Sequence, residues 1–219
     1  MLKAVYMTND SDQFFNVENL ALHFYGKQGW NGLHSENNLM RYLYGVLFWD
    51  EIYYPKVPYV FQTPYQFGPL DFHDTDFYLN RKEIIDAKLR RLEAMNREEI
   101  KAYFLEEYEK HKHIHNNIVN WDNQRLNCSR LANILYCCGS KLVCMFFRYL
   151  AQDYKTWFYG MPDLILWRMS EQRVKFVEVK SEADVLSEQQ KCWIANITHM
   201  DIEVELCQVT CGVDGVDVF

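Results

Sequence analysis

The pattern of hydrophobic and polar residues divides the chain into a helical first part and a strand-rich last part. Residues 15–54 predict helices, with an amphipathic segment, a break at G-W-N-G, and a strongly apolar stretch over residues 36–54. Residues 55–80 contain four of the five prolines and predict an irregular connection. From Arg81 to about Arg148 apolar residues again recur at helical spacing with charges between them, which predicts further amphipathic and buried helices.

After Gly160 the spacing becomes that of strands. Strands are expected over residues 163–167 and 174–180, with a polar hairpin turn between them, and over residues 202–209. Residues 187–200 predict a helix. The order strand, strand, helix, strand indicates an α/β core with a mixed sheet that is preceded by, and interrupted with, helices.

Composition favours a globular protein of the reducing interior of the cell. The chain has 219 residues, of which 49% are hydrophobic, enough for a sizeable core. No apolar run approaches the roughly 18 to 20 residues that span a membrane, and the N-terminus lacks a signal-peptide core. Seven cysteines occur without a single C-x-x-C pair, which argues against a zinc ribbon. We expect a soluble, intracellular protein without a membrane partner.

The net charge of −7 lowers the expectation of a nucleic-acid partner, because phosphate contacts need lysine and arginine. A local basic face remains compatible with this total. A site built from several carboxylates for a divalent metal would itself make the total more negative. Charge alone therefore leaves DNA binding open.

The first candidate for chemistry combines P-D at 162–163 with E-V-K at 178–180. Glu178 and Lys180 are two apart on a strand and share one face. Asp163 begins the preceding strand, so a hairpin would bring its carboxylate beside Glu178. Two adjacent carboxylates repel unless a cation lies between them. A hard divalent ion, Mg²⁺ or Mn²⁺, suits such oxygen ligands.

Such a site suits phosphodiester hydrolysis. The metal would polarise the phosphate and lower the pKa of a water, and Lys180 would position that water or offset developing charge. The spacing P-D-x14-E-x-K follows the short and degenerate pattern of PD-(D/E)xK nucleases. An exposed Glu–Lys ladder on a surface hairpin would give the same letters, so both interpretations stand at this point.

Glu36 adds a third carboxylate. On the predicted helix it aligns with Leu39, Met40, Leu43 and Leu47, on the apolar stripe that faces the core. An inward carboxylate is costly unless it is paired or bound to metal. The alternative is a first-turn glutamate favoured by the helix dipole.

Several motifs together resemble one family. They are H-S-E-N-N at 34–38, F-W-D, P-Y-V-F, P-L-D at 69–71, P-D-L-I-L-W, V-E-V-K and D-V-L-S-E-Q-Q. They are similar to the nuclease region of the Fanconi-associated nuclease family, whose catalytic part is a VRR-NUC domain of the PD-(D/E)xK superfamily. The resemblance covers nearly the whole chain. It implies one domain over residues 1–219 with a restriction-endonuclease-like core: helices with Glu36 in 15–54, an irregular and helical insertion in 55–150, and the sheet core in 151–219.

The resemblance also implies the roles of individual residues. Glu36, Asp163 and Glu178 would bind Mg²⁺ or Mn²⁺, Val179 is assigned to the metal site with them, and Lys180 would be the catalytic lysine.

Three further positions match the family. Asp184 matches a position that is important for activity, although Val185 stands where the family often has a basic residue, a difference that bears on DNA contact. Gln66 and Gln190 match family glutamines and are expected near the site. For Gln190 a helix cap is an equally good interpretation, because S-E-Q-Q forms a capping box with Ser187 as N-cap.

The activities implied are those of a 5′-flap endonuclease and a 5′-to-3′ exonuclease on branched, 5′-phosphorylated DNA. They would serve interstrand crosslink repair in the nucleus, with Fanconi pathway proteins as candidate partners. The family's upstream ubiquitin-binding finger, SAP domain and helical repeats are absent, so we expect most surfaces that hold duplex DNA to be missing. Two alternatives stay open: a non-catalytic remnant that binds DNA or a repair partner, and a Holliday-junction-resolving relative.

Other candidates have plainer interpretations. His111, His113 and His115 predict a solvated helix end rather than a metal site, because acidic residues surround them. The basic residues between 81 and 91 predict either phosphate contacts or a solvated helix face with ion pairs.

Overall fold

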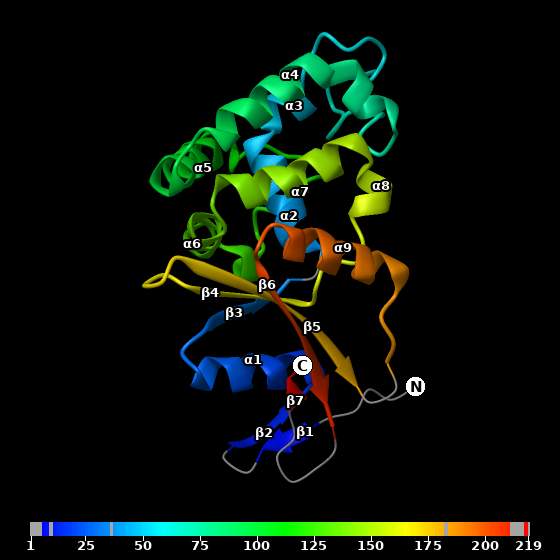
Figure 1. Cartoon of the computed structure of the whole chain (residues 1–219). Helices are drawn as coiled ribbons and strands as arrows, with labels where there is room; N and C mark the ends of the chain where they lie inside the picture. The colour runs from blue at the N-terminus through cyan, green and yellow to red at the C-terminus, as the bar shows by residue number, and fades with distance from the viewer. Residues whose placement is uncertain (1–5, 9–10, 36, 182–183, 211–216, 219) are drawn as a thin grey trace. The chain divides into compact units, whose positions relative to one another are not determined.

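A computed structural model describes residues 6–8, 11–35, 37–181, 184–210 and 217–218, and the chain divides into two compact units. The first unit is drawn from residues 1–37 and 160–219, and the second from residues 38–159. Figure 1 shows the elements of both. The expectation of a single domain over all 219 residues stays a prediction.

The first unit is built on a five-stranded sheet with the order β3-β4-β5-β6-β7. Its strands are β3 (Asn31–His34), β4 (Leu164–Arg168), β5 (Arg173–Ser181), β6 (Glu203–Val209) and β7 (Asp217–Val218). The pair β5–β6 is parallel and the other pairs are antiparallel. The predicted α/β core with a mixed sheet is therefore confirmed. A separate two-stranded sheet joins β1 (Tyr6–Thr8) to β2 (Ser11–Phe15).

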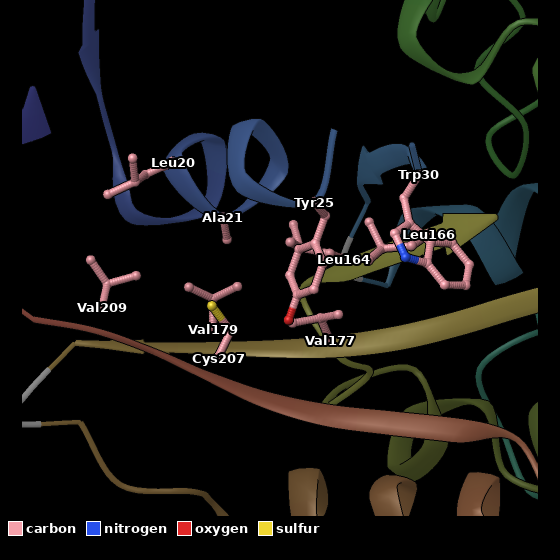
Figure 2. Packing of buried hydrophobic residues seen from close by; sticks show 10 residues of the cluster. All are labelled: Leu20, Ala21, Tyr25, Trp30, Leu164, Leu166, Val177, Val179, Cys207 and Val209. Carbon is pink, nitrogen blue, oxygen red and sulfur yellow. The ribbon is translucent and has the colours of Figure 1, made fainter. Parts of the chain in front are cut away.

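Helices α1 (Val17–Lys27) and α9 (Glu188–His199) lie on opposite faces of this sheet (Figure 1). The apolar side of α1 packs on side chains from β4, β5 and β6 (Figure 2). The buried cluster comprises Leu20, Ala21, Tyr25, Trp30, Leu164, Leu166, Val177, Val179, Cys207 and Val209. Burying each large apolar side chain contributes about 1.5–3 kcal/mol, so this packing holds β5 firmly.

The orientation of β5 determines which face of the sheet its polar side chains occupy. Val177 and Val179 point toward α1 in Figure 2. Because side chains alternate along a strand, Glu178 and Lys180 project from the other face, the one that α9 covers. The residues of α9 that are buried are Trp193 and Ile197. The alternation predicted from the sequence thus delivers both polar side chains to one side of the sheet.

The two stretches of the first unit meet close to where the chain leaves and re-enters it. The backbone N–H of Met161 donates to Oδ1 of Asn37 at 3.2 Å. Two residues further along, the carbonyl of Asp163 accepts from the N–H of Ser35 at 3.1 Å. These bonds set the start of β4 relative to the end of β3.

The second unit is helical. Its helices are α2 (Asn38–Leu47), α3 (Trp49–Ile52), α4 (Asp76–Glu93), α5 (Arg97–His111), the 3-10 turn η1 (Gln124–Leu126), α6 (Cys128–Cys138), α7 (Ser140–Gln152) and α8 (Tyr154–Trp157). Helix α4 packs on α7, and α5 on α6. Within the described ranges no single helix is long and apolar enough to cross a membrane, and α6 with α7 meets that test only as a pair bent by 105°.

The apolar stripe predicted for α2 is confirmed. Leu39, Met40, Leu43 and Leu47 are all buried. On the same helix Gly45 lies against the loop that follows α5: a Cβ at this position would sit 2.5 Å from a methyl of Val119. A larger residue there would push the loop away from the helix.

Two parts of the secondary-structure prediction are wrong. The break at G-W-N-G runs into strand β3, an edge strand too short to show an alternating pattern. A Cβ at Gly32 in this strand would lie 2.5 Å from Cδ2 of Leu22 and 2.9 Å from Cδ2 of Leu166, so both leucine side chains would have to move to admit a larger residue. Residues 112–123 are not helical either, since asparagine side chains there bind backbone N–H groups and compete with helix formation.

The basic helix around residues 81–91 is not uniformly solvated. The guanidinium of Arg81 is buried and binds Asp71 through two hydrogen bonds, Nη1 to Oδ2 at 2.7 Å and Nη2 to Oδ1 at 3.1 Å. Lys88 is buried too, with Nζ 2.5 Å from the Tyr103 hydroxyl and 3.6 Å from Glu51. For these two residues phosphate contact and solvation are both wrong as predictions, whereas the expected ion pairs are present, between Arg81 and Asp71 and between Lys88 and Glu51.

The expectation of a solvated helix end is also wrong for His111. Its ring is buried, stacks on Trp49 with centroids 4.7 Å apart, and places Nε2 3.3 Å from Oε2 of Glu107. His113 and His115 are exposed as expected. The His111 ring is shielded from solvent by its contact with Trp49, a residue of another helix. Helical spacing within α5 does not reveal such a contact.

Acid should destabilise the protein through His111. Burial, followed by the charge of Lys110, lowers the pKa of this imidazole, while Glu107 and Asp50 oppose the shift. A depressed folded-state pKa stabilises the fold above the unfolded-state value of about 6.5, and that stability is lost as pH falls through the folded-state pKa. Urea titrations should show a smaller loss of unfolding free energy between pH 7.5 and 5.5 in His111→Phe than in the wild type. An unchanged difference would contradict the assignment, and His115→Phe, at an exposed position, is the control.

Candidate active site

Asp163 and Glu178 are neighbours because of the β4–β5 register. Leu164 pairs with Val177, so one step outward brings Asp163 opposite Glu178. The Asp163 carboxylate is held by the backbone N–H of Val179, which donates to Oδ2 at 2.9 Å. The hairpin expected from the sequence therefore places the two carboxylates side by side. Since the Val179 side chain faces α1, only its main chain is available to this site.

Glu178 is the most enclosed member of the site, with a side chain 1% exposed. Its Oε1 lies 2.9 Å from Nζ of Lys180 and accepts from Nε2 of Gln190 at 2.5 Å. Its other oxygen, Oε2, is buried and has no hydrogen-bond partner among the described residues. An unpaired buried carboxylate oxygen is costly, so this atom marks a place where a positive ligand would be favoured.

Burial disfavours the charged form of both carboxylates, and Lys180 compensates for this only in part. Burial, followed by the negative charge of Asp163, raises the pKa of Glu178 to about 7, and Lys180 only partly offsets this. Burial also raises the pKa of Asp163, against the stabilising N–H of Val179. A divalent cation would favour the charged form of both groups.

Gln190 makes two sets of contacts, one in the helix cap and one with the candidate site, whereas the sequence presented the cap and a position near the site as alternatives. The capping box is present: Ser187 Oγ accepts from the Gln190 N–H at 3.2 Å, and Gln190 Oε1 accepts from the Ser187 N–H at 2.9 Å. The same side chain donates to Glu178 and accepts from Nζ of Lys180 at 3.3 Å. This link was missed, although Gln190 lies three residues before the buried Trp193 and so on the inward side of α9.

A glycine next to the site was also missed. Gly160 has φ of +87°, and a Cβ on it would lie 2.8 Å from Cβ and 2.9 Å from the carbonyl carbon of Gln189. The chain leading into Asp163 therefore passes directly against the first turn of α9. Only glycine combines this backbone conformation with so close an approach.

Asp184 and Gln66, the other predicted site residues that the structure describes, bind groups close to them in the sequence. The exposed carboxylate of Asp184 accepts from the N–H and the hydroxyl of Ser181, at 3.1 and 2.7 Å, and these bonds lower its pKa. These bonds tie Asp184 to Ser181 at the end of β5, and Val185 beside it is 84% exposed. Gln66 belongs to the second unit, where Nε2 donates to the carbonyls of Val60 and Gly68 and Oε1 accepts from the Gln62 N–H. Roles of Asp184 and Gln66 in activity stay predictions.

Glu36 lies outside the described residues. Within those that are described, no group of three or more histidine, cysteine, aspartate or glutamate side chains could hold a metal. The residues present still fit a hard divalent cation: they offer two adjacent carboxylates, one with an unpaired buried oxygen. Oxygen donors of this kind suit Mg²⁺ or Mn²⁺.

Fanconi-associated nucleases of several organisms are similar to most of this chain. The chain is 40% identical over 200 residues to the Fanconi-associated nuclease 1 homolog of Oryza sativa subsp. japonica, covering 89% of this chain and 20% of that protein. It is 37% identical to the homolog of Dictyostelium discoideum (88% and 19%) and 31% identical to human Fanconi-associated nuclease 1 (89% and 19%). The chain thus spans about a fifth of the length of these curated relatives.

A solved structure shares the fold. The crystal structure of paFAN1 bound to 2nt 5′-flap DNA with a gap aligns with a TM-score of 0.79 and 26% identity, over 93% of this chain and 36% of that one. The VRR-NUC domain family matches residues 95–211, more than half of the chain. On this evidence the chain belongs to the VRR-NUC family, as its motifs indicated.

Proposed function

We propose that this chain is a metal-dependent DNA nuclease that hydrolyses phosphodiester bonds in branched DNA, as a 5′-flap endonuclease and 5′-to-3′ exonuclease. The observation that carries the proposal is the pairing of Asp163 with Glu178, whose buried Oε2 has no hydrogen-bond partner among the described residues, beside the ammonium of Lys180. The proposed setting is interstrand crosslink repair in the nucleus, together with Fanconi pathway proteins.

The residues have distinct proposed tasks. Asp163 and Glu178 would hold Mg²⁺ or Mn²⁺, with Glu36 and the main chain of Val179 as further ligands. When bound, the cation would polarise the phosphate and lower the pKa of a water. The Lys180 side chain is 14% exposed, and its ammonium would stabilise the charge that develops on a bound phosphate. Gln190 contacts both Lys180 and Glu178 and would hold these two side chains in position.

The relatives support the choice of substrate. Fanconi-associated nucleases match most of this chain, and the two paFAN1 structures contain 5′-flap DNA. Val185 in place of a basic residue removes one potential phosphate contact next to Asp184.

The proposal is tested by a cleavage panel. Labelled 5′-phosphorylated flaps, nicked duplexes and four-way junctions are incubated with the chain in Mn²⁺, in Mg²⁺ or in chelator. Metal-dependent cleavage near the flap junction is the expected result. Cleavage of four-way junctions alone would favour a resolvase, and DNA binding without turnover in either metal would favour a non-catalytic remnant.

Gln190→Met separates capping from positioning. It removes half of the capping box and both contacts with Glu178 and Lys180, so we expect a stability loss of about 1 kcal/mol and slower cleavage, roughly tenfold. Ser187→Ala removes the other half of the capping box but leaves the contacts with Glu178 and Lys180, and should lower stability with cleavage nearly unchanged. Thermal unfolding and single-turnover cleavage measure the two effects. Equal cleavage by both variants would show that Gln190 acts only as a cap.

A further inference from the structure

The second unit contains a pocket that the proposed active site does not use. It has a volume of about 430 Å³ and opens between the start of α2 and the loop after α5. Helix α2 contributes Asn38, Arg41 and Tyr42, and the loop contributes residues 112–123 together with Leu126. This volume suits a ligand of the size of one nucleotide.

The loop side of the pocket is fixed by its own hydrogen bonds. Oδ1 of Asn116 accepts from the N–H groups of Ile118 and Val119 at 2.8 and 2.6 Å. Nε1 of Trp121 donates to the Ile114 carbonyl at 2.9 Å, and Nη2 of Arg41 donates to the Asn117 carbonyl at 2.8 Å. A wall that is already ordered costs little conformational entropy when a ligand binds.

The lining favours an anion. Arg41, Lys112, His113 and His115 all offer N–H donors, and Asp122 is the one acidic residue among the described lining residues. This local balance is opposite in sign to the chain's net charge of −7. Lys112 is paired with Glu109 at 2.6 Å but keeps a side chain 31% exposed.

Two buried polar atoms on residues that line the pocket have no hydrogen-bond partner among the described residues. Nε of Arg41 and Oη of Tyr42 are buried without a hydrogen bond in the described part of the chain. The Tyr42 residue as a whole is 3% exposed, and burial, followed by nearby Tyr108, raises its pKa. A ligand with oxygen acceptors would find unused donors here.

An exposed aromatic ring lies beside the pocket. Phe67 has 56% exposure, and its ring centroid is 6.3 Å from that of His115. Its carbonyl is anchored by the Asn117 N–H at 3.3 Å and by the Tyr53 hydroxyl at 2.8 Å. Ile114, which also lines the pocket, is 45% exposed. A fixed apolar ring next to basic side chains is the arrangement that proteins use to stack unpaired bases and hold their phosphates.

We propose that this pocket and the Phe67 ring bind unpaired nucleotides of single-stranded DNA, with phosphate at the basic lining and a base on Phe67. The inference rests on the proposed function in one respect, since a flap is the source of the single strand. Binding itself needs neither metal nor cleavage, which allows the two to be tested separately.

The test is fluorescence anisotropy of a labelled oligothymidylate with the full chain in chelator. Phe67→Ala keeps the anchored backbone, and Lys112→Gln combined with His113→Gln removes donors; each should weaken binding about tenfold. Leu79→Ala and Arg90→Gln, exposed positions on α4 outside the pocket, are matched controls that should stay within about twofold. Phe67→Ala decides the question if the double variant does not fold.

Competition identifies the ligand. Thymidine monophosphate should displace the oligonucleotide better than inorganic phosphate, and poly-glutamate should not displace it. Absence of binding by the wild type, equal binding by the pocket variants, or equal displacement by poly-glutamate would overturn the inference. Flap cleavage by the wild type in Mn²⁺, measured in parallel, reports on the proposed function alone.

Discussion

Glu178→Gln is expected to reduce metal-dependent cleavage by at least about a hundredfold, because it removes one of the charged carboxylate ligands proposed for the metal. The amide keeps the shape of the side chain, and Lys180, which loses its carboxylate partner, has a side chain that is 14% exposed and still contacts Gln190. Its unfolding midpoint in chelator should therefore stay within a few degrees of the wild-type value.

Thermal unfolding with and without Mn²⁺ gives a second readout. A ligand that binds the folded state raises the midpoint of the wild type. In Glu178→Gln this shift should be largely lost. Glu188→Gln, an exposed glutamate at the start of α9, is the matched control and should retain both the shift and cleavage. Full cleavage by Glu178→Gln would show that the active site has been wrongly assigned.

The second large effect is on stability and concerns Arg81. Arg81→Met should lower the free energy of unfolding by roughly 3–5 kcal/mol, because it leaves the buried carboxylate of Asp71 without its cation. The guanidinium also lies over the Phe77 ring at 4.3 Å, and this contact is lost too. Urea unfolding measures the change.

Two controls define the origin of that loss. The double variant Arg81→Met with Asp71→Leu removes both charges and should recover much of the stability. Lys82→Met disrupts an exposed ion pair with Asp86 on the same helix and should cost less than about 1 kcal/mol. A loss below about 1 kcal/mol in Arg81→Met would mean that water or another cation compensates Asp71.

Local signals explain what could be predicted from the sequence. The alternation over β5, the polar turn before it and the capping box of α9 each involve residues a few positions apart, so the hairpin and the helix were predicted almost to their ends. The convergence of Asp163 and Glu178 follows from that hairpin. For the same reason the apolar stripe of α2 was predicted correctly.

Long-range contacts explain what could not be predicted. In the sequence Arg81 and His111 look like surface residues. Their partners, Asp71 and Trp49, lie outside the helices that carry them, so helical spacing does not reveal these contacts. Strand β3 exists because it pairs with β4, which lies far along the chain. The link from Gln190 to Glu178 required the packing of α9 on the sheet, which no spacing encodes.

The hydrogen bond between Met161 and Asn37 has a consequence for how such a chain tolerates change in length. It ties together, within the first unit, the two points between which residues 38–159 are inserted. The entropy needed to close an intervening segment grows only slowly with its length. We therefore expect insertions or deletions between these two points to leave the position of Asp163 in the sheet unchanged.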